Sequence, residues 1–562
     1  QNIFFAKYNN IGNYLNAGII GSYTNKIAIE KTKDITLDSS GNVYVIGDFN
    51  GTADFDPSNN TANLTSITDN ENIFFAKYDS NGNYIWAKAI LAIDFHCVSK
   101  SLALDDDGNL YITGYVDGNV DFDPSNGIAN LGLGGIGQNF IAKYDNNGNY
   151  LWAKLIGGRG SNDANPLLLA LDNANNIYVS GSFVDTKDFD PGAGTANLTA
   201  VGGDDIFIAK YNTNGDYLWA KALSGTDDEV VNSMALDNSG NFYLTGRFSG
   251  TSDFDPGVGT ANFNCMGWVD LFIAKYDGNG NYLWTKTIGG PDYEMGCSLA
   301  LDSNDNIYLT GDFSPSVDFD PGVGVAIISE DPNGGTFIAK YDTNGNYIWA
   351  EAINYSFPIL DLELDNNNNI YISGNFTDDT DFDPGIGITS FNTEDTNWNL
   401  FLAKYDTNGS YLWAGPLASG KFDHKVIQSL ASDDTGNIYL GGNFLSTANF
   451  NVSTGTYNLT TLNNHDMFVA KYNMSSLSVN ENTLSNTIKL YPNPTKNNFT
   501  LAFEEYKNGT VCILDILGNK IQEYNFTNQD QIKISLDNVA SGIYLVQLLN
   551  GIEKTTYKVI KQ

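Results

Sequence analysis

One short stretch of sequence recurs along this chain at an almost constant distance. "FIAKYDTNGNYIWA" occupies Phe337–Ala350, and close copies occupy Phe74–Ala87, Phe207–Ala220 and Phe272–Thr285. The tyrosine of the A-K-Y triplet falls at Tyr8, Tyr78, Tyr144, Tyr211, Tyr276, Tyr341, Tyr405 and Tyr472, so the successive gaps are 70, 66, 67, 65, 65, 64 and 67 residues. A period of this length indicates that each repeat is one supersecondary unit, and that neighbouring units bury a continuous core together.

Each repeat contains four strand patterns. In the unit that begins at Ser298 these are "SLALD", "NIYLTGDF", "TFIAKYD" and "NYIWAEAI", and each alternates in the way that a half-buried strand requires. Turns rich in Asn, Asp and Gly join strand one to two and strand three to four, which predicts two tight hairpins. A single four-stranded sheet cannot bury both faces, whereas radially stacked sheets cover one another and leave few open edges.

The number of repeats predicts the fold class. A second landmark, "LDSNDNIYLTGDF" at Leu301–Phe313, has relatives that begin at Leu37, Leu104, Leu171, Leu236, Leu364 and, in degraded form, Ala431. Seven copies predict an all-β fold, with a seven-bladed β-propeller over residues 1–472. The chain starts inside a repeat, so we expect the N-terminal residues to close the blade that contains Ile438–Phe444. The eighth A-K-Y copy is then a surplus strand with no assigned place.

Six tryptophans share one register of the repeat and are predicted to fill the gaps between neighbouring blades. They are Trp86, Trp152, Trp219, Trp284, Trp349 and Trp413.

The repeat resembles the SBBP-type bacterial β-propeller repeat and, more distantly, the NHL repeat. The matching core is "GNFYLTGRF" followed by "DLFIAKYDGNGNYLW", and the resemblance covers about Asn2 to Asn473. It implies a propeller fold but no particular activity, because propellers host unrelated functions.

An insert of roughly 25 residues joins strands two and three, and in six repeats it opens with the motif D-F-D-P. In an extended segment residues i and i+2 share a face, so the two carboxylates point together and the phenylalanine points away. The paired residues are Asp54 and Asp56, Asp121 and Asp123, Asp188 and Asp190, Asp253 and Asp255, Asp318 and Asp320, and Asp381 and Asp383. The seventh copy reads Asn449-Phe450-Asn451 and lacks both carboxylates.

Two adjacent carboxylates need a cation nearby, or one of them takes up a proton. One candidate is the A-K-Y lysine, which lies in mid-strand where lysine is unusual, and which would pair with a D-F-D-P carboxylate within about 4 Å. These lysines are Lys77, Lys143, Lys210, Lys275, Lys340 and Lys404. The alternative is Ca²⁺, which takes clustered carboxylate and carbonyl oxygens and would make the twelve aspartates metal ligands.

Charge limits the classes of partner. Residues 488–562 contain 8 Lys against 7 Asp or Glu, whereas residues 1–487 contain 21 Lys or Arg against 59 Asp or Glu, a net charge of −38. Such a field repels nucleic acid and anionic membranes, so no nucleic-acid partner is expected. No apolar run predicts a transmembrane segment, and a chain that starts at Gln1 fits a mature, processed protein.

The topology predicts a binding face. The inserts and the connections between blades, such as Ser224–Val230 and Ile288–Gly296, are expected to lie opposite the tight hairpins. Because loops on a rigid scaffold are where binding usually occurs, we expect a binding or adhesion module for an extracellular protein or glycan.

An enzyme is the less favoured interpretation. The three histidines, His96, His424 and His465, lie at unrelated repeat positions, and six equivalent aspartate pairs favour a scaffold over an active site. Two alternatives stay open: a hydrolase or lyase with its site in the central channel, and a structural surface-coat protein. An asymmetric pocket with strongly shifted pKa values would favour the enzyme.

Composition changes after Tyr472. Residues 473–487 are polar and free of repeats, as a linker is. Residues 488–562 show about seven short strand patterns with turn signals, which predicts a small Ig-like β-sandwich.

This last segment closely resembles the type A C-terminal sorting domain of the type IX secretion system of Bacteroidota. The matching motifs are Tyr491-Pro492-Asn493-Pro494, Asp515-Ile516-Leu517-Gly518, Gly542-Ile543-Tyr544-Leu545-Val546 and Lys558-Val559-Ile560-Lys561. The resemblance implies a secreted or cell-surface protein that crosses the outer membrane through the translocon and meets a β-barrel shuttle protein. It also implies a sortase-like peptidase that often removes the domain and transfers the cargo to lipopolysaccharide. The residues assigned to the signal are Tyr491, Pro492, Asn493, Pro494, Gly518, Gly542, Tyr544, Lys558 and Lys561.

Overall fold

A computed structural model divides the chain into two compact units, Gln1–Leu477 and Ser478–Gln562, each of which is described by itself. The structure describes residues 2–8, 14–21, 30–58, 60–67, 70–132, 137–157, 167–329, 334–353, 359–376, 380–385, 388–391, 399–417, 426–433, 436–449, 458–473, 488–491, 495–514, 520–537, 539–540, 542–550 and 553–561. These residues form strands, turns and bends and contain no helix, as the repeat pattern predicts.

The first unit is a succession of mainly antiparallel sheets, each built around four strands that follow in chain order with the insert strands between the second and the third. The first sheets are β3 (Glu30–Leu37), β4 (Val43–Phe49), β7 (Asn72–Tyr78) and β8 (Tyr84–Ala92); then β9 (His96–Leu104), β10 (Leu110–Asp117), β13 (Gln138–Tyr144) and β14 (Tyr150–Ile156); then β15 (Leu167–Leu171), β16 (Ile177–Phe183), β19 (Asp205–Tyr211) and β20 (Tyr217–Gly225). The next are β21 (Glu229–Leu236), β22 (Phe242–Phe248), β25 (Asp270–Tyr276) and β26 (Tyr282–Ile288); β27 (Met295–Leu301), β28 (Ile307–Phe313), β31 (Gly335–Tyr341) and β32 (Tyr347–Ile353); and β33 (Ile359–Leu364), β34 (Ile370–Phe376), β35 (Asn399–Tyr405) and β36 (Tyr411–Leu417).

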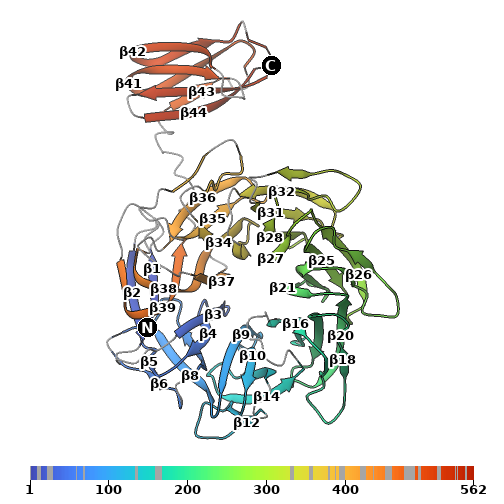
Figure 1. Ribbon diagram of the computed structural model, residues 1–562. Helices are drawn as coiled ribbons and strands as arrows, with labels where there is room; N and C mark the ends of the chain where they lie inside the picture. Colours follow the sequence, from blue (N-terminus) through green and yellow to red (C-terminus); the bar gives the residue numbers. More distant parts are fainter. Residues whose placement is uncertain are drawn as a thin grey trace. The chain divides into compact units, whose positions relative to one another are not determined.

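The first strand of each sheet contacts the first strand of the next. β3 contacts β9, β9 contacts β15, and the series continues through β21, β27 and β33 to β37 (Val426–Ser432), which contacts β3 again. The contacts therefore close on themselves, and the sheets of this unit radiate from a common middle like the blades of a propeller (Figure 1).

The chain ends of this unit meet in the closing sheet, whose order is β37, β38 (Asn437–Asn449), β39 (Asn458–Asn473), β1 (Asn2–Tyr8) and β2 (Tyr14–Gly21). The N-terminal strands thus close the sheet that contains Ile438–Phe444, as predicted. β39 is the third strand, and β1 lies parallel to it with Phe5 opposite Val469 and Lys7 opposite Lys471. The surplus A-K-Y copy therefore has a place beside its own counterpart.

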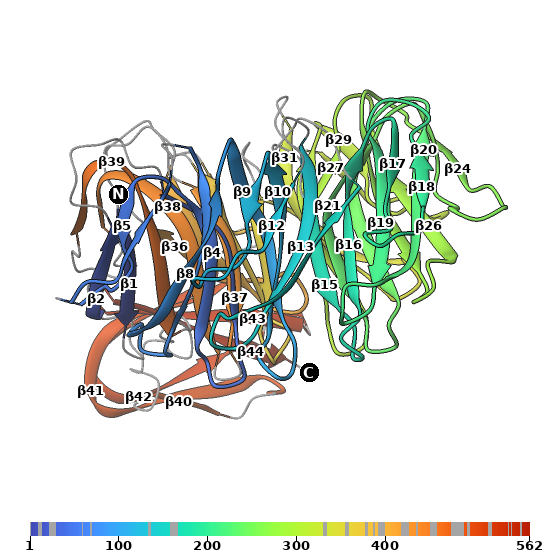
Figure 2. The same ribbon diagram turned by 90° about the horizontal axis from the view of Figure 1, so that it is seen from below.

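The inserts form short outer hairpins (Figure 2). They are β5 (Thr52–Asp54) with β6 (Asn63–Thr65), β11 (Val120–Asp121) with β12 (Asn130–Leu131), β17 (Thr186–Asp188) with β18 (Asn197–Thr199), β23 (Thr251–Asp253) with β24 (Asn262–Asn264), and β29 (Ser316–Asp318) with β30 (Ile327–Ser329). In several repeats the insert pairs with the outermost strand of the preceding sheet, as Gly225 of β20 does with Ser252 of β23.

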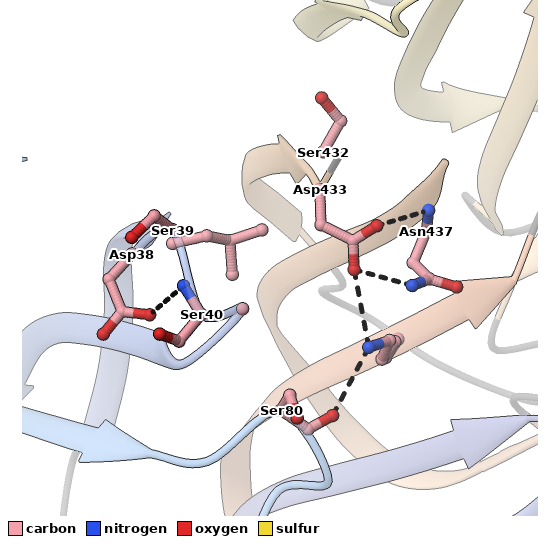
Figure 3. A pocket seen from close by; sticks show the side chains of 10 residues that line it. Asp38, Ser39, Ser40, Ser80, Ser432, Asp433 and Asn437 are labelled. Carbon is pink, nitrogen blue, oxygen red and sulfur yellow. Dashed lines mark hydrogen bonds and ion pairs between the residues drawn. The ribbon is translucent and has the colours of Figure 1, made fainter. Parts of the chain in front are cut away.

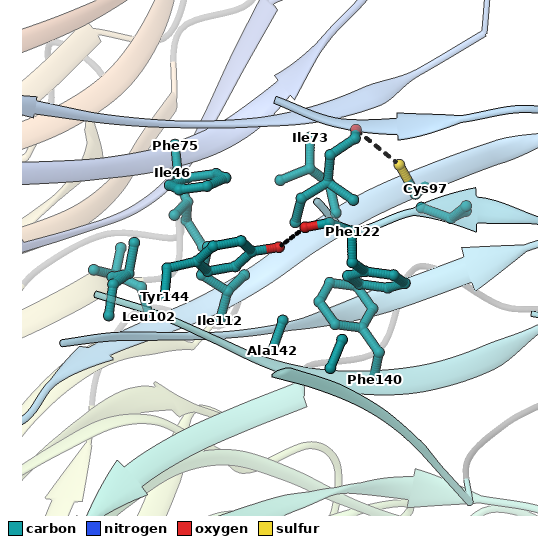
Figure 4. Close-up of a cluster of buried hydrophobic side chains, with 14 of the residues drawn as sticks. Ile46, Ile73, Phe75, Cys97, Leu102, Ile112, Phe122, Phe140, Ala142 and Tyr144 are labelled. Atoms are coloured by element: carbon teal, nitrogen blue, oxygen red, sulfur yellow. Dashed lines mark hydrogen bonds between the residues drawn. The ribbon is translucent and has the colours of Figure 1, made fainter. Parts of the chain in front are cut away.

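Separate apolar cores lie between neighbouring sheets. Figure 4 shows the one between the first and second sheets, where Ile46 and Phe75 of one sheet meet Ile112, Phe140 and Tyr144 of the other. The hydroxyl of Tyr144 donates to the carbonyl of Phe122 at 2.9 Å, so the ring is buried with its polar atom satisfied. Each sheet buries both faces only because it has a neighbour on each side.

Five of the six predicted tryptophans lie at joints between sheets, each against a glycine of the next sheet; the described residues do not test this prediction for Trp413. Gly345, in the turn from β31 to β32, has φ +72°, and a Cβ added to it would lie 2.9 Å from Cζ3 of Trp284 in the preceding sheet. The same contact joins Gly148 to Trp86, Gly215 to Trp152, Gly280 to Trp219 and Gly409 to Trp349. No side chain other than hydrogen fits between that turn and the indole.

The other hairpin of each repeat lacks this constraint. Gly240, in the turn from β21 to β22, has φ +80° but nothing within 4 Å of an added Cβ. At the same position of other repeats, Asn175, Asp305 and Asn368 take φ values of 58–59°. Asn and Asp tolerate the left-handed region, so this turn accepts side chains where the space is open.

The second unit contains β40 (Ile488–Tyr491), β41 (Asn498–Leu514), β42 (Lys520–Ser535), β43 (Gly542–Asn550) and β44 (Glu553–Lys561). They form one five-stranded sheet around a core that includes Phe499, Ile513 and Val546. The sequence predicts about seven short strands, and the structure has fewer and longer ones because β41 and β42 stay paired across register shifts between Ala502 and Gly509.

The glycine contact can be tested with a matched pair of substitutions. Gly345→Ala should lower the free energy of unfolding by about 2–4 kcal/mol, because a strained φ and a clash with Trp284 act together. Gly240→Ala should cost only about 1 kcal/mol, since strain acts there alone. Urea unfolding measures both, and equal losses would show that the indole contact contributes nothing.

Candidate functional site

The paired aspartates of D-F-D-P are bound by their own loops. In the fifth repeat Asp318 Oδ1 accepts the backbone N–H groups of Asp320 at 3.1 Å and Ala326 at 2.8 Å. Asp320 Oδ1 accepts the N–H of Gly322 at 2.8 Å. Phe319 between them is fully buried. The motif therefore folds the start of the insert and anchors it in the core.

The same bonds recur in every predicted pair. The first aspartate of each pair, namely Asp54, Asp121, Asp188, Asp253, Asp318 or Asp381, accepts two N–H groups, two and eight residues further along the chain. The second, namely Asp56, Asp123, Asp190, Asp255, Asp320 or Asp383, accepts one N–H group two residues further on. Asn449 of the seventh copy is in β38, whereas Phe450 and Asn451 lie outside the described residues.

The A-K-Y lysine has a different partner from the one predicted. Lys210 Nζ lies 3.0 Å from Asp172 Oδ2, and Asp172 is the first residue of the turn between strands one and two. The equivalent pairs are Lys77 with Asp38, Lys143 with Asp105, Lys275 with Asp237, Lys340 with Asp302, Lys404 with Asp365, and Lys471 with Asp433, at 3.2–3.6 Å. The predicted partner is wrong because the D-F-D-P carboxylates are occupied by backbone N–H groups at the start of the insert. An aspartate recurs as the first residue of the turn between strands one and two of each repeat, and this recurrence is the sequence signal for the true partner.

These lysines also link neighbouring sheets. The ammonium of Lys340 lies 4.5 Å from the ring centroid of Tyr308 and donates to Thr407 Oγ1 of the next sheet at 3.2 Å. Every lysine of the series lies over the equivalent tyrosine, and several reach the next hairpin in the same way. A charge bound by a carboxylate, an aromatic face and a neighbouring turn is a structural cross-link.

Where the closing sheet meets the first sheet, the lysine and aspartate of this cross-link line a cleft. It measures about 410 Å³ and is lined by residues that include Asp38, Ser80, Asp433 and Lys471. In Figure 3 Asp433 binds Asn437 and the lysine, and the lysine donates to the carbonyl of Ser80 at 3.3 Å. Dashed lines also join Asp38 to Ser40 within one turn, so several of the polar groups that line the cleft are bound by their neighbours (Figure 3).

Acidic side chains occur on the first strands, around the middle of the unit. Asp34 of β3 accepts four hydrogen bonds, from the N–H groups of Ile35 and Leu102 and the hydroxyls of Ser101 and Ser429, at 2.8–3.1 Å. These donors belong to the first, second and closing sheets. The carboxylate therefore joins three sheets at once.

A second acidic residue makes the same kind of link. Asp361 of β33 accepts from Leu362 N–H, Leu430 N–H and the Ser298 hydroxyl at 2.7–3.1 Å. Burial raises the pKa of Asp361 to about 6, although these donors act in the opposite direction. Burial also raises the pKa of Glu363 to about 7, and Glu363 accepts from the hydroxyl of Ser432 at 2.8 Å. Sequence reasoning did not single out these residues, since most repeats have no acid at these strand positions.

Apolar side chains are exposed on the inserts. Val258 and Val323 at the tips of the fourth and fifth inserts are fully exposed, and Met266 and Trp268 are exposed by 71% and 81%. Further large apolar side chains are exposed on the same segments: Ile67, Ile128, Val201, Val325, Ile327 and Ile388. Two of the eight tryptophans, Trp268 and Trp398, are outside the register of the other six, which is the signal that sequence reasoning missed; Trp398 lies outside the described residues.

The residues assigned to the sorting signal have different environments. Tyr491 is exposed by 49%, whereas Tyr544 is buried and donates to the carbonyl of Ala540 at 2.7 Å. Lys561 is buried and donates to the carbonyls of Leu536 and Val539. Gly542 begins β43, and Lys558 lies in β44. Pro492, Asn493, Pro494 and Gly518 lie outside the described residues.

The described part of the chain contains no group of three or more His, Cys, Asp or Glu side chains arranged to bind a metal ion. Its strands are accompanied by no helix long and apolar enough to cross a bilayer.

The C-terminal unit matches a known family. Residues 489–562 match the secretion system C-terminal sorting domain. This match indicates cargo of the type IX secretion system, so the protein interacts with that export machinery and is secreted or displayed at the cell surface through the outer membrane.

Curated relatives are larger proteins. The chain is 28% identical over 446 residues to an uncharacterized WD repeat-containing protein of Acanthamoeba polyphaga mimivirus, covering 67% of this chain and 31% of that protein. It is 26% identical over 147 residues to the regulatory protein FlaEY of Caulobacter vibrioides, covering 26% and 15%. It is 39% identical over 77 residues to an endo-acting ulvan lyase of Formosa agariphila, covering 13% and 15%. The chain thus spans less than a third of the length of each.

Two solved structures are distant likenesses, each at 11% identity. A protein of unknown function from Bacteroides caccae aligns with a TM-score of 0.31, over 61% of this chain and 89% of that one. A dihydro-heme d1 dehydrogenase aligns with a TM-score of 0.35, over 80% and 75%.

The role of the D-F-D-P carboxylates can be tested at Asp318. Asp318→Ala removes the acceptor of two N–H groups and should lower the free energy of unfolding by about 1–3 kcal/mol, with or without EDTA. Thermal unfolding in calcium and in EDTA measures the loss. Ile327→Ala, on the exposed face of the same insert, is the control. A loss that appears only in calcium would favour the Ca²⁺ alternative.

The raised pKa of Glu363 predicts a pH dependence. The folded protein keeps this proton up to about pH 7, whereas the unfolded chain releases it near 4.5, so stability falls as the pH rises between these values. Glu363→Gln should remove that part of the fall, as measured by urea unfolding at several pH values. Ser432→Ala keeps the carboxyl group and should keep the slope. An unchanged slope in Glu363→Gln would contradict this account.

Proposed function

We propose that the protein is a secreted binding or adhesion module, in which a seven-bladed β-propeller presents its insert face to an extracellular protein or glycan. The C-terminal unit, an Ig-like β-sandwich in this proposal, acts as the export signal. Residues 1–472 form the propeller, 473–487 the linker and 488–562 the sorting domain. The repeat is of the SBBP type and the source lies among the Bacteroidota.

The observation that carries this proposal is the exposure of large apolar side chains on the inserts. Val258, Val323 and Trp268 extend into solvent from segments whose D-F-D-P bases are anchored in the core. Exposed apolar side chains on rigid supports, within a polar surface, are typical of protein interaction sites.

The acidic residues favour the same conclusion over catalysis. Two carboxylates on first strands of the sheets, Asp34 and Asp361, accept hydrogen bonds from the backbone and serine hydroxyls of neighbouring sheets. A general acid or base needs an oxygen that can reach substrate. Raised pKa values at Asp361 and Glu363 are the observation that favours the alternative, a hydrolase or lyase with its site in the central channel.

Other parts of the proposal concern the partners. The sorting domain would meet the outer-membrane shuttle protein, with Tyr491 as its exposed aromatic contact, and a sortase-like peptidase would remove it. Ca²⁺ remains the proposed alternative role for the twelve D-F-D-P aspartates. A structural surface coat is a further alternative, because exposed apolar inserts could also pack between copies.

Retention on surfaces tests the proposal. The full-length protein should bind members of an array of extracellular proteins, glycans and whole bacteria. Val258→Ser combined with Val323→Ser should reduce that binding several-fold, because the apolar contact is lost while the core is untouched. Leu283→Ser combined with Ile348→Ser, on the outer strands, is the matched control.

Three results would contradict it. If the wild-type protein binds nothing on the array, the proposal of a binding module is contradicted. Release of soluble sugar or peptide products would favour the enzyme, and ordered sheets of purified protein would favour the coat.

A further inference from the structure

Trp268 departs from the repeat. The tryptophans of the A-K-Y hairpins lie at the joints between sheets, as Trp219 and Trp284 do. Trp268 instead follows β24 in the fourth insert, and 81% of its surface is exposed. Met266, two residues before it, is exposed by 71%. Leaving so much apolar surface in water is unfavourable, and the repeat pattern of the chain does not require it.

The segment that presents these two side chains is firmly bound. Asp270 is buried, and its carboxylate accepts Met266 N–H at 2.9 Å and Gly267 N–H at 3.4 Å. The N–H groups of Trp268 and Val269 donate to the carbonyl of Asp292 at 2.8 and 3.2 Å. The backbone is therefore fixed from both sides before any partner arrives, which reduces the entropy lost on binding.

The surroundings of Trp268 are acidic. Asp292, whose backbone carbonyl accepts the N–H of Trp268, is exposed, and so are Asp227 and Asp228 on the neighbouring connection. Gly250 lies between that connection and the segment that carries Trp268. It lies beside Asp227, and its carbonyl accepts the N–H of Cys265 at 2.8 Å. The whole chain adds a net charge of −37.

The cation of this region is already engaged. Arg247 donates to the hydroxyl of Tyr293 at 2.6 Å and lies 5.9 Å from the centre of its ring. It also donates to the sulfur of Met295 at 3.8 Å. Arg247 is thus bound to Tyr293 and Met295, and the carboxylates of Asp227 and Asp228 accept hydrogen bonds from Thr226 and Asp204.

We propose that Trp268 and Met266 are the docking point for a basic protein segment, in which a lysine or arginine of the partner lies over the indole. This inference rests on the proposed binding function and names its partner class. The indole face attracts a cation, Met266 contacts the aliphatic stem, and the surrounding carboxylates steer the segment to the site. The charge of the chain selects this occupant, because an acidic partner would be repelled and a neutral glycan would gain nothing from it.

The test uses full-length protein labelled with ¹⁵N at tryptophan, with the Trp268 indole signal assigned from Trp268→Phe. The probes are a peptide of alternating Lys and Gly, its Glu-for-Lys counterpart and a mixture of neutral oligosaccharides. The basic peptide should shift the Trp268 signal, and its affinity should fall as salt rises. Trp268→Ala should weaken binding of this peptide about 3- to 30-fold. Asp292→Asn should weaken it less, and Leu283→Ala, an exposed residue of β26, should leave it unchanged.

Several results would overturn the inference. These are a Trp268 signal that responds to oligosaccharides but not to the peptide, a signal that shifts only with protein concentration, or equal peptide affinity in Trp268→Ala. If the wild type and Trp268→Ala bind the surface array equally well, the proposed binding function is supported and the proposed Trp268 site is contradicted. If the wild type binds neither the array nor the peptide, the proposed function fails as well.

Discussion

The contact between an indole and the next glycine turn is the constraint on which the propeller-like unit depends. Trp284 in one sheet lies against Gly345 in the following one, and the same pair recurs from Trp86 to Gly409. The turn needs a positive φ, and the indole leaves no space for a Cβ. One position thus satisfies a backbone requirement and a packing requirement together, and the repeat of about 66 residues places it at five joints of the described part of the chain.

Electrostatic cross-links reinforce these joints without forming a reactive site. Lys340 is bound by Asp302, the ring of Tyr308 and Thr407 of the next sheet. Asp34 joins three sheets through four hydrogen bonds. Buried charges are tolerated when every polar atom has a partner, and here the partners come from different repeats. The acidic composition therefore serves assembly as well as surface charge.

Departures from the repeat are informative about function. Equivalent residues in every repeat, such as the D-F-D-P aspartates, fold the inserts. Residues that occur once, such as Trp268, have no structural requirement of this kind. The proposed binding role rests on such a residue, which a firmly bound segment presents to solvent. The sorting domain is a separate compact unit, and its buried Tyr544 and Lys561 maintain its own fold.

The sequence by itself determined the repeat, its four strands, the tight hairpins, the tryptophans at the joints and the identity of the sorting domain. Each of these depends on local alternation, turn chemistry or a short motif, which a linear pattern records. The tertiary structure decided which charges meet. The partner of Lys210 is Asp172 and not a D-F-D-P carboxylate, and Asp34 binds Ser429 across 395 positions of sequence. Such pairs depend on how the sheets face each other around the ring. A repeat pattern gives the spacing of residues along the chain but not which side chains of different repeats lie close together in space.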